Sequence, residues 1–275
     1  MLDVLREMLS YSFMVRALIV GFLVSLCASL LGVSLVLKRY AMIGDGLSHV
    51  GFGALAIATA LGLAPLEVTI PVVVVAAFLL LRLSENSKIK GDAAIAMIST
   101  GSLALGVIVL ALSTGMNTDV CNYLFGSILV MSRSDVTLSI ILAIIVLVLY
   151  LVFYRKLFAV TFDETFARAT GTNTNIYNML IAFLTAITIV LGMRMMGAML
   201  ISSLVIFPAL TAMRLCKRFK TVTVCAAIVS VSCFALGMVA SYLLATPAGA
   251  SVVVVNIAVF LCFTLIARLK GRILK

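Results

Sequence analysis

The sequence predicts an all-α integral membrane protein, a polytopic bundle of about nine transmembrane helices, with eight as the alternative. Of its 275 residues, 64% are hydrophobic and only 11% are charged, whereas a soluble domain carries about 25% charged residues. Apolar runs of about 20 residues, the length that a helix needs to cross a bilayer, recur along the whole chain. We therefore expect one transmembrane domain over residues 1–275.

Polar segments and turns divide the apolar sequence into the predicted spans. A pair of cations, Lys38 and Arg39, ends the first span; polar segments at 82–92 and 113–121 enclose the fourth; the long polar stretch 154–174 follows the fifth; and a turn at 246–249 precedes the last. The spans cover about residues 13–37, 40–63, 65–81, 93–112, 135–153, 175–193, 195–213, 221–244 and 250–267. Eight spans result if one of these stretches does not cross.

Three features depart from a simple row of spans. Residues 1–11 have mixed charge and favour an amphipathic helix that lies in the membrane interface. Residues 122–131 are apolar but too few to cross as a helix, which favours a re-entrant or interfacial helix. Pro208 lies in the second half of the seventh span, where we expect it to kink or break the helix.

The net charge of +10 is a topology signal. Sixteen of the 20 Lys and Arg residues fall in the segments on one side of the nine-span arrangement, and four fall on the other side. Since positive charge is retained in the cytoplasm, the side with sixteen is cytoplasmic, the N-terminus lies outside and the C-terminus inside. The basic residues do not alternate with aromatic residues, so no nucleic-acid partner is expected.

Asp45 and His49 are the residues most suited to chemistry. His49 is the only histidine, and Asp45 is the only acid well inside an apolar span. On a helix the two project from one face, about 6 Å apart. A helical rise of about 1.5 Å per residue from Lys38 places them about 10–17 Å into the membrane. Such residues usually face a cavity, because a charge in hydrocarbon is costly.

A carboxylate and an imidazole together suit manganese, iron or zinc better than calcium or an organic solute. Two ligands are too few for a tight structural site, which is compatible with a site that must release its ion. The alternatives are a structural pair between helices and a proton relay. We favour an ion path, because the two groups lie one turn apart at mid-depth.

A second stretch, FDETFARATG at residues 162–171, lies in the long cytoplasmic segment. Asp163 and Glu164 stand where acids stabilise a helix N-terminus, and Gly171 fits a C-terminal cap. We expect a short helix across the membrane surface, with Phe162 and Phe166 on one side. The pattern alone gives equal weight to an amphipathic connector and to a docking helix for a cytosolic partner.

Several chemical motifs do not occur in the sequence. It contains no G-x-x-x-x-G-K-[ST] phosphate-binding loop, nucleophile elbow or HExxH motif, so we expect a transport subunit and not an enzyme. If ATP powers the protein, another polypeptide must hydrolyse it. The six cysteines are scattered and include no CxxC pair, which favours small apolar residues over a disulfide framework or a zinc cluster.

Together these stretches resemble the membrane permease subunit of bacterial ABC importers for manganese, zinc or iron. The family pattern R-x-x-x-I-G-D-x-x-S-H is matched by Arg39, Ile43, Gly44, Asp45, Ser48 and His49. The run YLFGSIL at 123–129 resembles the same run in the family, and SSLVIFPA at 202–209 resembles its SSLLIxPA. The helix at 162–171 is similar to its coupling helix. A departure is the run from Val50 to Gly53, which lacks a proline that many relatives have there.

The resemblance implies a homodimer in the bacterial cytoplasmic membrane, with a cytosolic ABC ATPase and an extracytoplasmic solute-binding protein as partners. Asp45 and His49 match the family's metal-binding positions. Asp163, Glu164, Phe166 and Arg168 fall on the coupling helix. The cargo would be a divalent manganese, zinc or iron ion, and no covalently bound cofactor is implied.

Two other classes remain open. A secondary transporter or channel would use Asp45 and His49 as an ion or proton relay and would need no ATPase. A membrane receptor would recruit a partner through residues 154–174 without moving an ion.

Overall fold

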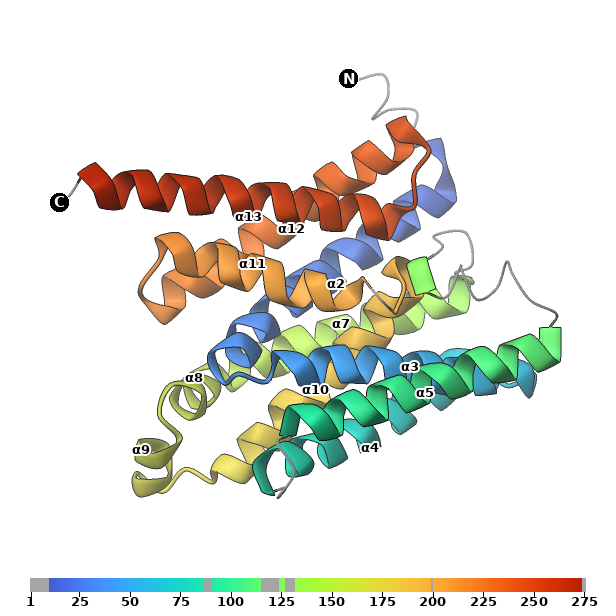
Figure 1. Ribbon diagram of the computed structural model, residues 1–275, viewed down its shortest axis with the longest axis horizontal. Helices are drawn as coiled ribbons and strands as arrows, with labels where there is room; N and C mark the ends of the chain where they lie inside the picture. Colours follow the sequence, from blue (N-terminus) through green and yellow to red (C-terminus); the bar gives the residue numbers. More distant parts are fainter. Residues whose placement is uncertain (1–9, 87–90, 115–123, 127–131, 199, 274–275) are drawn as a thin grey trace.

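The computed structural model describes residues 10–86, 91–114, 124–126, 132–198 and 200–273. These residues form helices joined by turns, and no strand occurs among them. The helices, shown in Figure 1, are α2 (Ser12–Leu37), α3 (Ala41–Ala60), α4 (Pro65–Asn86), α5 (Gly91–Thr114), α7 (Arg133–Val152), α8 (Tyr154–Phe162), α9 (Glu164–Ala169), α10 (Thr174–Met196), α11 (Ile201–Leu215), α12 (Phe219–Leu244) and α13 (Ala248–Ile273).

The prediction of a polytopic helical bundle is confirmed. Within the described residues, eight helices are long and apolar enough to cross a membrane, and α11, with 15 residues, is shorter. At about 1.5 Å per residue, α11 spans about 22 Å, less than the hydrocarbon core. The nine predicted spans therefore correspond to eight full-length helices and one short one.

The start of the seventh span differs from the prediction. The sequence places it at Met195, but α10 continues to Met196 and ends at Gly197, whose φ is +88°. This left-handed conformation is one that glycine adopts without steric cost. The chain then turns, and α11 begins only at Ile201. Pro208 lies inside α11, and the helix continues past it to Leu215.

The polar segment at 154–174 contains more helix than the sequence predicts. It forms α8, which the sequence did not indicate, followed by α9. Asp163 separates them with an extended backbone, so Phe162 belongs to α8 and not to the helix that carries Phe166. The end of α2 and the start of α3 lie at the same end of the bundle as α8 and α9 (Figure 1).

The three most buried membrane helices are α2, α3 and α10, whereas α5 and α13 are mostly exposed. Helix α3 packs against α4, α5, α10 and α11. Gly53 allows the close contact with α5, because a Cβ atom there would lie 2.7 Å from the Ser102 carbonyl oxygen. The outward apolar faces of α5 and α13 suit contact with lipid or with another membrane chain.

Two predicted segments lie outside the described residues. These are the amphipathic helix at 1–11, of which only residues 10 and 11 are described, and the re-entrant helix at 122–131, of which only residues 124–126 are described. Both stay predictions.

Candidate functional site

Asp45 and His49 lie one turn apart on α3, as predicted. The His49 Nε2 atom is 3.7 Å from the Asp45 Oδ2 atom, and the side chains are 15% and 40% exposed, respectively. Their neighbours Gly44 and Gly51 face Ile189 and Met193 of α10. The segment of α3 that carries the pair is therefore level with the half of α10 that is farther from α9.

A third side chain, which sequence reasoning missed, reaches this pair from α11. The Ser202 hydroxyl donates a hydrogen bond to the Asp45 Oδ1 atom at 3.0 Å. Ser202 is the second residue of α11, so the short helix begins at the level of the pair. The neighbouring Ser203 instead donates to the Leu200 carbonyl oxygen at 2.6 Å. Of the two adjacent hydroxyls, only that of Ser202 is therefore bonded to the pair.

The distance between His49 and Asp45 suits a shared ion better than a direct hydrogen bond. A separation of 3.7 Å is too long for a hydrogen bond. Zinc binds imidazole nitrogen and carboxylate oxygen at about 2.0–2.2 Å, so two such ligands at the tetrahedral angle lie about 3.4 Å apart. The His49 Nδ1 atom is buried and has no hydrogen-bond partner among the residues that the structure describes.

One chain offers few ligands around this pair. Within the part of the chain that the structure describes, no group of three or more His, Cys, Asp or Glu side chains is placed to hold a metal ion. Asp45 and His49 can therefore supply two ligands, and the remaining positions of an ion would need water, a hydroxyl group or a second chain.

The glycines around the pair serve helix packing. A Cβ atom at Gly46 would meet Ile95 and Ser99 of α5, and one at Gly51 would meet Met193 of α10. Both glycines therefore allow α3 to approach its neighbours closely.

The second predicted site is the short helix α9. The Asp163 side chain caps its N-terminus by accepting a hydrogen bond from the Phe166 backbone N–H at 2.8 Å. Gly171, with a φ of +79°, ends it: the Gly171 and Thr172 N–H groups donate to the Arg168 and Ala167 carbonyls, both at 3.0 Å. This is the pattern of a glycine cap. The predicted cap residues are therefore confirmed.

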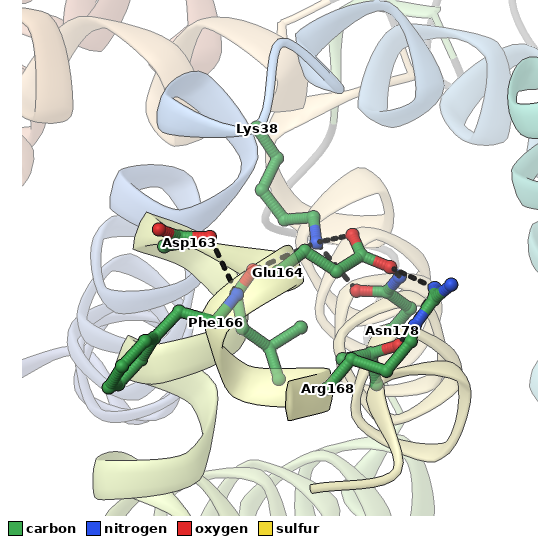
Figure 2. Close-up of polar contacts among 8 residues, drawn as sticks. Lys38, Asp163, Glu164, Phe166, Arg168 and Asn178 are labelled. Atoms are coloured by element: carbon green, nitrogen blue, oxygen red, sulfur yellow. Dashed lines mark hydrogen bonds and ion pairs between the residues drawn. The ribbon is translucent and has the colours of Figure 1, made fainter. Parts of the chain in front are cut away.

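The predicted residues of α9 face two ways (Figure 2). Glu164 points toward α2 and α10, where its Oε2 atom is 3.1 Å from the Lys38 Nζ atom. The Phe166 ring points away from this cluster and is 66% exposed. Arg168 lies at the edge and contacts Glu164 at 3.4 Å and the Thr174 hydroxyl at 3.3 Å.

The environment of Glu164 favours its charged form. Burial raises the pKa of the Glu164 carboxyl, but attraction to Lys38 lowers it. Hydrogen bonds from Lys38, Asn178 and Thr174 lower it further, and the pKa lies below its ordinary value. Glu164 is therefore ionised at neutral pH and holds α9 against α2 and α10.

A bundle of helices long and apolar enough to cross a membrane, with an acid and an imidazole on one of its most buried helices and a capped short helix at one end, is the architecture of a multi-pass membrane protein. The model of the ABC 3 transport family matches residues 10–267. The chain belongs to this family and is a multi-pass protein of the bacterial cytoplasmic membrane.

Named relatives cover nearly the whole chain. It is 31% identical to the high-affinity zinc uptake system membrane protein ZnuB of Haemophilus influenzae, over 89% of this chain and 94% of that protein. It is 30% identical to the manganese transport system membrane protein MntC of Halalkalibacterium halodurans, over 92% of this chain and 87% of that protein. The structure of PsaBC from Streptococcus pneumoniae in complex with Fab superposes with a TM-score of 0.87 at 28% identity, covering 98% of this chain and 99% of that chain.

Proposed function

We propose that this chain is the permease subunit of an ATP-driven ABC importer, and that its cargo is a divalent manganese, zinc or iron ion contacted by Asp45 and His49. The observation that carries the proposal is the acid and imidazole pair on α3, with a ligand-like separation of 3.7 Å. Relatives named for zinc and manganese transport support the choice of cargo.

Two copies of the chain would complete the ion site. The Asp45 side chain is 40% exposed in a single chain, which leaves room for further ligands beside it. A homodimer with this face at its axis would bring two carboxylates and two imidazoles around one ion. Four such ligands are enough for a divalent transition metal. An extracytoplasmic solute-binding protein would deliver the ion to this site.

A separate cytosolic ABC ATPase would hydrolyse the ATP, because the chain has no phosphate-binding loop of its own. Helix α9 would dock this ATPase. In this assignment Phe166 contacts the ATPase, Asp163 holds the start of α9, and Glu164 and Arg168 attach the helix to the bundle. ATP binding would close the two ATPases and move α9. That movement would shut the outer path and weaken the ion site, so that the ion leaves toward the cytoplasm.

The test is metal uptake by proteoliposomes that contain the permease, its ATPase and its binding protein. Asp45→Ala and His49→Ala should each abolish ATP-dependent accumulation and leave assembly with the ATPase intact. Asp92→Ala, which removes an exposed acid at the start of α5, is the matched control and should transport normally.

Two results would contradict the proposal. Normal uptake by both Asp45→Ala and His49→Ala would remove the pair from the mechanism. Uptake by the permease alone, driven by an ion gradient without the ATPase, would assign the chain to the secondary transporters or channels.

A further inference from the structure

The corner between α2 and α3 is attached to α9 by one buried side chain. Lys38 caps the C-terminus of α2, and its side chain is only 6% exposed. Its Nζ atom donates to Glu164 Oε2 of α9 at 3.1 Å, to Asn178 Oδ1 of α10 at 2.6 Å and to the Val160 carbonyl oxygen of α8 at 3.2 Å. Figure 2 shows Lys38 reaching down between α9 and α10.

The three contacts use the full capacity of the ammonium group. A lysine ammonium has three donors, and here each has an acceptor on a different helix. Asn178 also donates to Glu164 Oε1 at 3.3 Å, so the acceptors are themselves connected. A buried charge with all of its donors satisfied fixes the relative positions of the groups around it. The lysine therefore holds α8, α9 and α10 to the end of α2.

The same corner leads directly into the ion site. Only Arg39 and Tyr40 separate Lys38 from the start of α3. Arg39 has a φ of +62°, and the Tyr40 N–H donates to the Leu35 carbonyl oxygen at 2.8 Å. The connection is therefore a tight, hydrogen-bonded turn with little chain that could stretch. Asp45 follows on the second turn of α3.

Helix α9 can act on α3 by two routes. It packs against α8 and α10, and α10 in turn packs against α3; its ion pair with Lys38 joins it to the α2–α3 corner. Arg168 extends the contacts of α9 only toward Thr174 at the start of α10. A movement of α9 that carries Glu164 with it would therefore pull on Lys38, and through the turn on the helix that holds Asp45 and His49.

We propose that Lys38 is a positioning residue that transmits the movement of α9 to α3, so that it couples ATP hydrolysis to release of the ion held by Asp45 and His49. This role rests on the proposed function. Lys38 does not touch the ion; it acts through Glu164 on one side and through the α2–α3 turn on the other. Loss of the contact between Lys38 and Glu164 should lower the number of ions transported per ATP hydrolysed, while Asp45 and His49 still bind the ion.

The experiment measures metal ions transported per ATP hydrolysed in proteoliposomes that contain the whole complex, with radioactive manganese(II) as the cargo. Lys38→Met keeps the length of the side chain and removes its charge. We expect it to keep hydrolysing ATP while the ions moved per ATP fall at least about tenfold, because the change removes three hydrogen bonds of a charged group and one such bond alone is worth about a factor of ten. Lys156→Met is the control, because within the described residues the Lys156 side chain bonds only to the Thr172 hydroxyl, at 3.3 Å.

Two further variants keep the test decisive. Glu164→Gln preserves the shape of the acceptor and removes its charge, so it should also lower the ratio; it decides the question if Lys38→Met does not assemble. The exchange of both charges, Lys38→Glu with Glu164→Lys, should recover part of the ratio that either single change loses. A purely structural lysine would change the amount of complex and not the ions moved per ATP.

The outcomes distinguish this inference from the proposed function. A wild-type ratio in both Lys38→Met and Glu164→Gln, or an equal loss in Lys156→Met, would overturn the role of Lys38. Failure of the wild-type complex to accumulate manganese(II), zinc(II) or iron(II) with ATP would instead overturn the proposed function.

Discussion

Asp45 has two kinds of neighbours, and they differ in how far away they lie in the sequence. His49 is one helical turn along α3, whereas Ser202 comes from α11, 157 positions away. The Ser202 hydrogen bond is directed at a carboxylate oxygen, so it orients the group and stabilises its charge. The aspartate is therefore held from α11 while its other oxygen faces His49.

Ser202→Ala should weaken metal binding without preventing assembly. A hydrogen bond to a charged group contributes about 1.5–3 kcal/mol, so we expect the metal concentration for half-maximal uptake to rise by about tenfold. Ser203→Ala is the matched control, because that hydroxyl bonds within its own turn of chain. Equal metal concentrations for half-maximal uptake in the Ser202→Ala variant and the wild type would show that the hydrogen bond from α11 does not contribute to metal binding by Asp45.

The sequence could predict one part of this site and not the other. Asp45 and His49 follow from local spacing, because a separation of four residues on a helix defines a shared face. No local pattern distinguishes Ser202 from Ser203. The contact depends on where α11 begins relative to α3, and that position depends on packing over the whole bundle.

At the scale of elements, the least predictable features are the ends of α10 and α11. Hydropathy is continuous from residue 195 to 213, so it gives no sign that Gly197 ends one helix and that the next begins at Ile201. Helix α9 was easier to predict, because Asp163 and Gly171 are both cap residues with local signals. Helix α8 has no comparable signal at its start.

The attachment of α9 should weaken in acid. The pKa of Glu164 in the folded protein lies below its ordinary value, so the stabilisation is complete above the unfolded-state pKa of about 4.3 and is lost as pH falls through the folded-state value. The charged groups facing Glu164 are Lys38 and Arg168. Both are cations, so protonation of the carboxyl removes their attraction to it.

A single tryptophan can report this change, because the chain has none. In the isolated permease, the fluorescence of a Phe166→Trp variant should be constant from pH 7 to about pH 5 and should change below about pH 4.3. Adding Glu164→Gln should abolish the transition. An unchanged transition in that double variant would assign the acid response to another group.

At the scale of the whole molecule, the candidate ion site on α3 and the candidate docking helix α9 lie in different parts of the bundle. The acid and imidazole pair lies on α3, one of the three most buried helices, whereas α9 presents an exposed aromatic ring near the start of α10. The polytopic helical architecture was predictable from composition and run length. The way in which α9 joins this architecture was not, because Lys38 and Glu164 are 126 positions apart.

Phe166→Ala should weaken binding of the ATPase by about tenfold, because an aromatic side chain at the centre of an interface commonly contributes 1 kcal/mol or more. The measurement is the affinity of the purified ATPase for the detergent-solubilised permease. Leu244→Ala is the control: Leu244 is 71% exposed, similar to Phe166 at 66%, but it ends α12 at the other side of the membrane. Equal affinities of the ATPase for the wild type, Phe166→Ala and Leu244→Ala would place the docking surface elsewhere.

The small number of donor atoms beside Asp45 bears on how the metal specificity of such a transporter can change during evolution. Divalent first-row metals compete for nitrogen and oxygen donors in a fixed order of affinity, and selection among them comes from geometry and from supply. Within the described part of the chain, an acid and an imidazole form no larger cage that could enforce one geometry. In the proposed dimer, two acids and two imidazoles are a donor set that several of these metals accept, so we expect the proposed delivery protein to contribute to the choice among them.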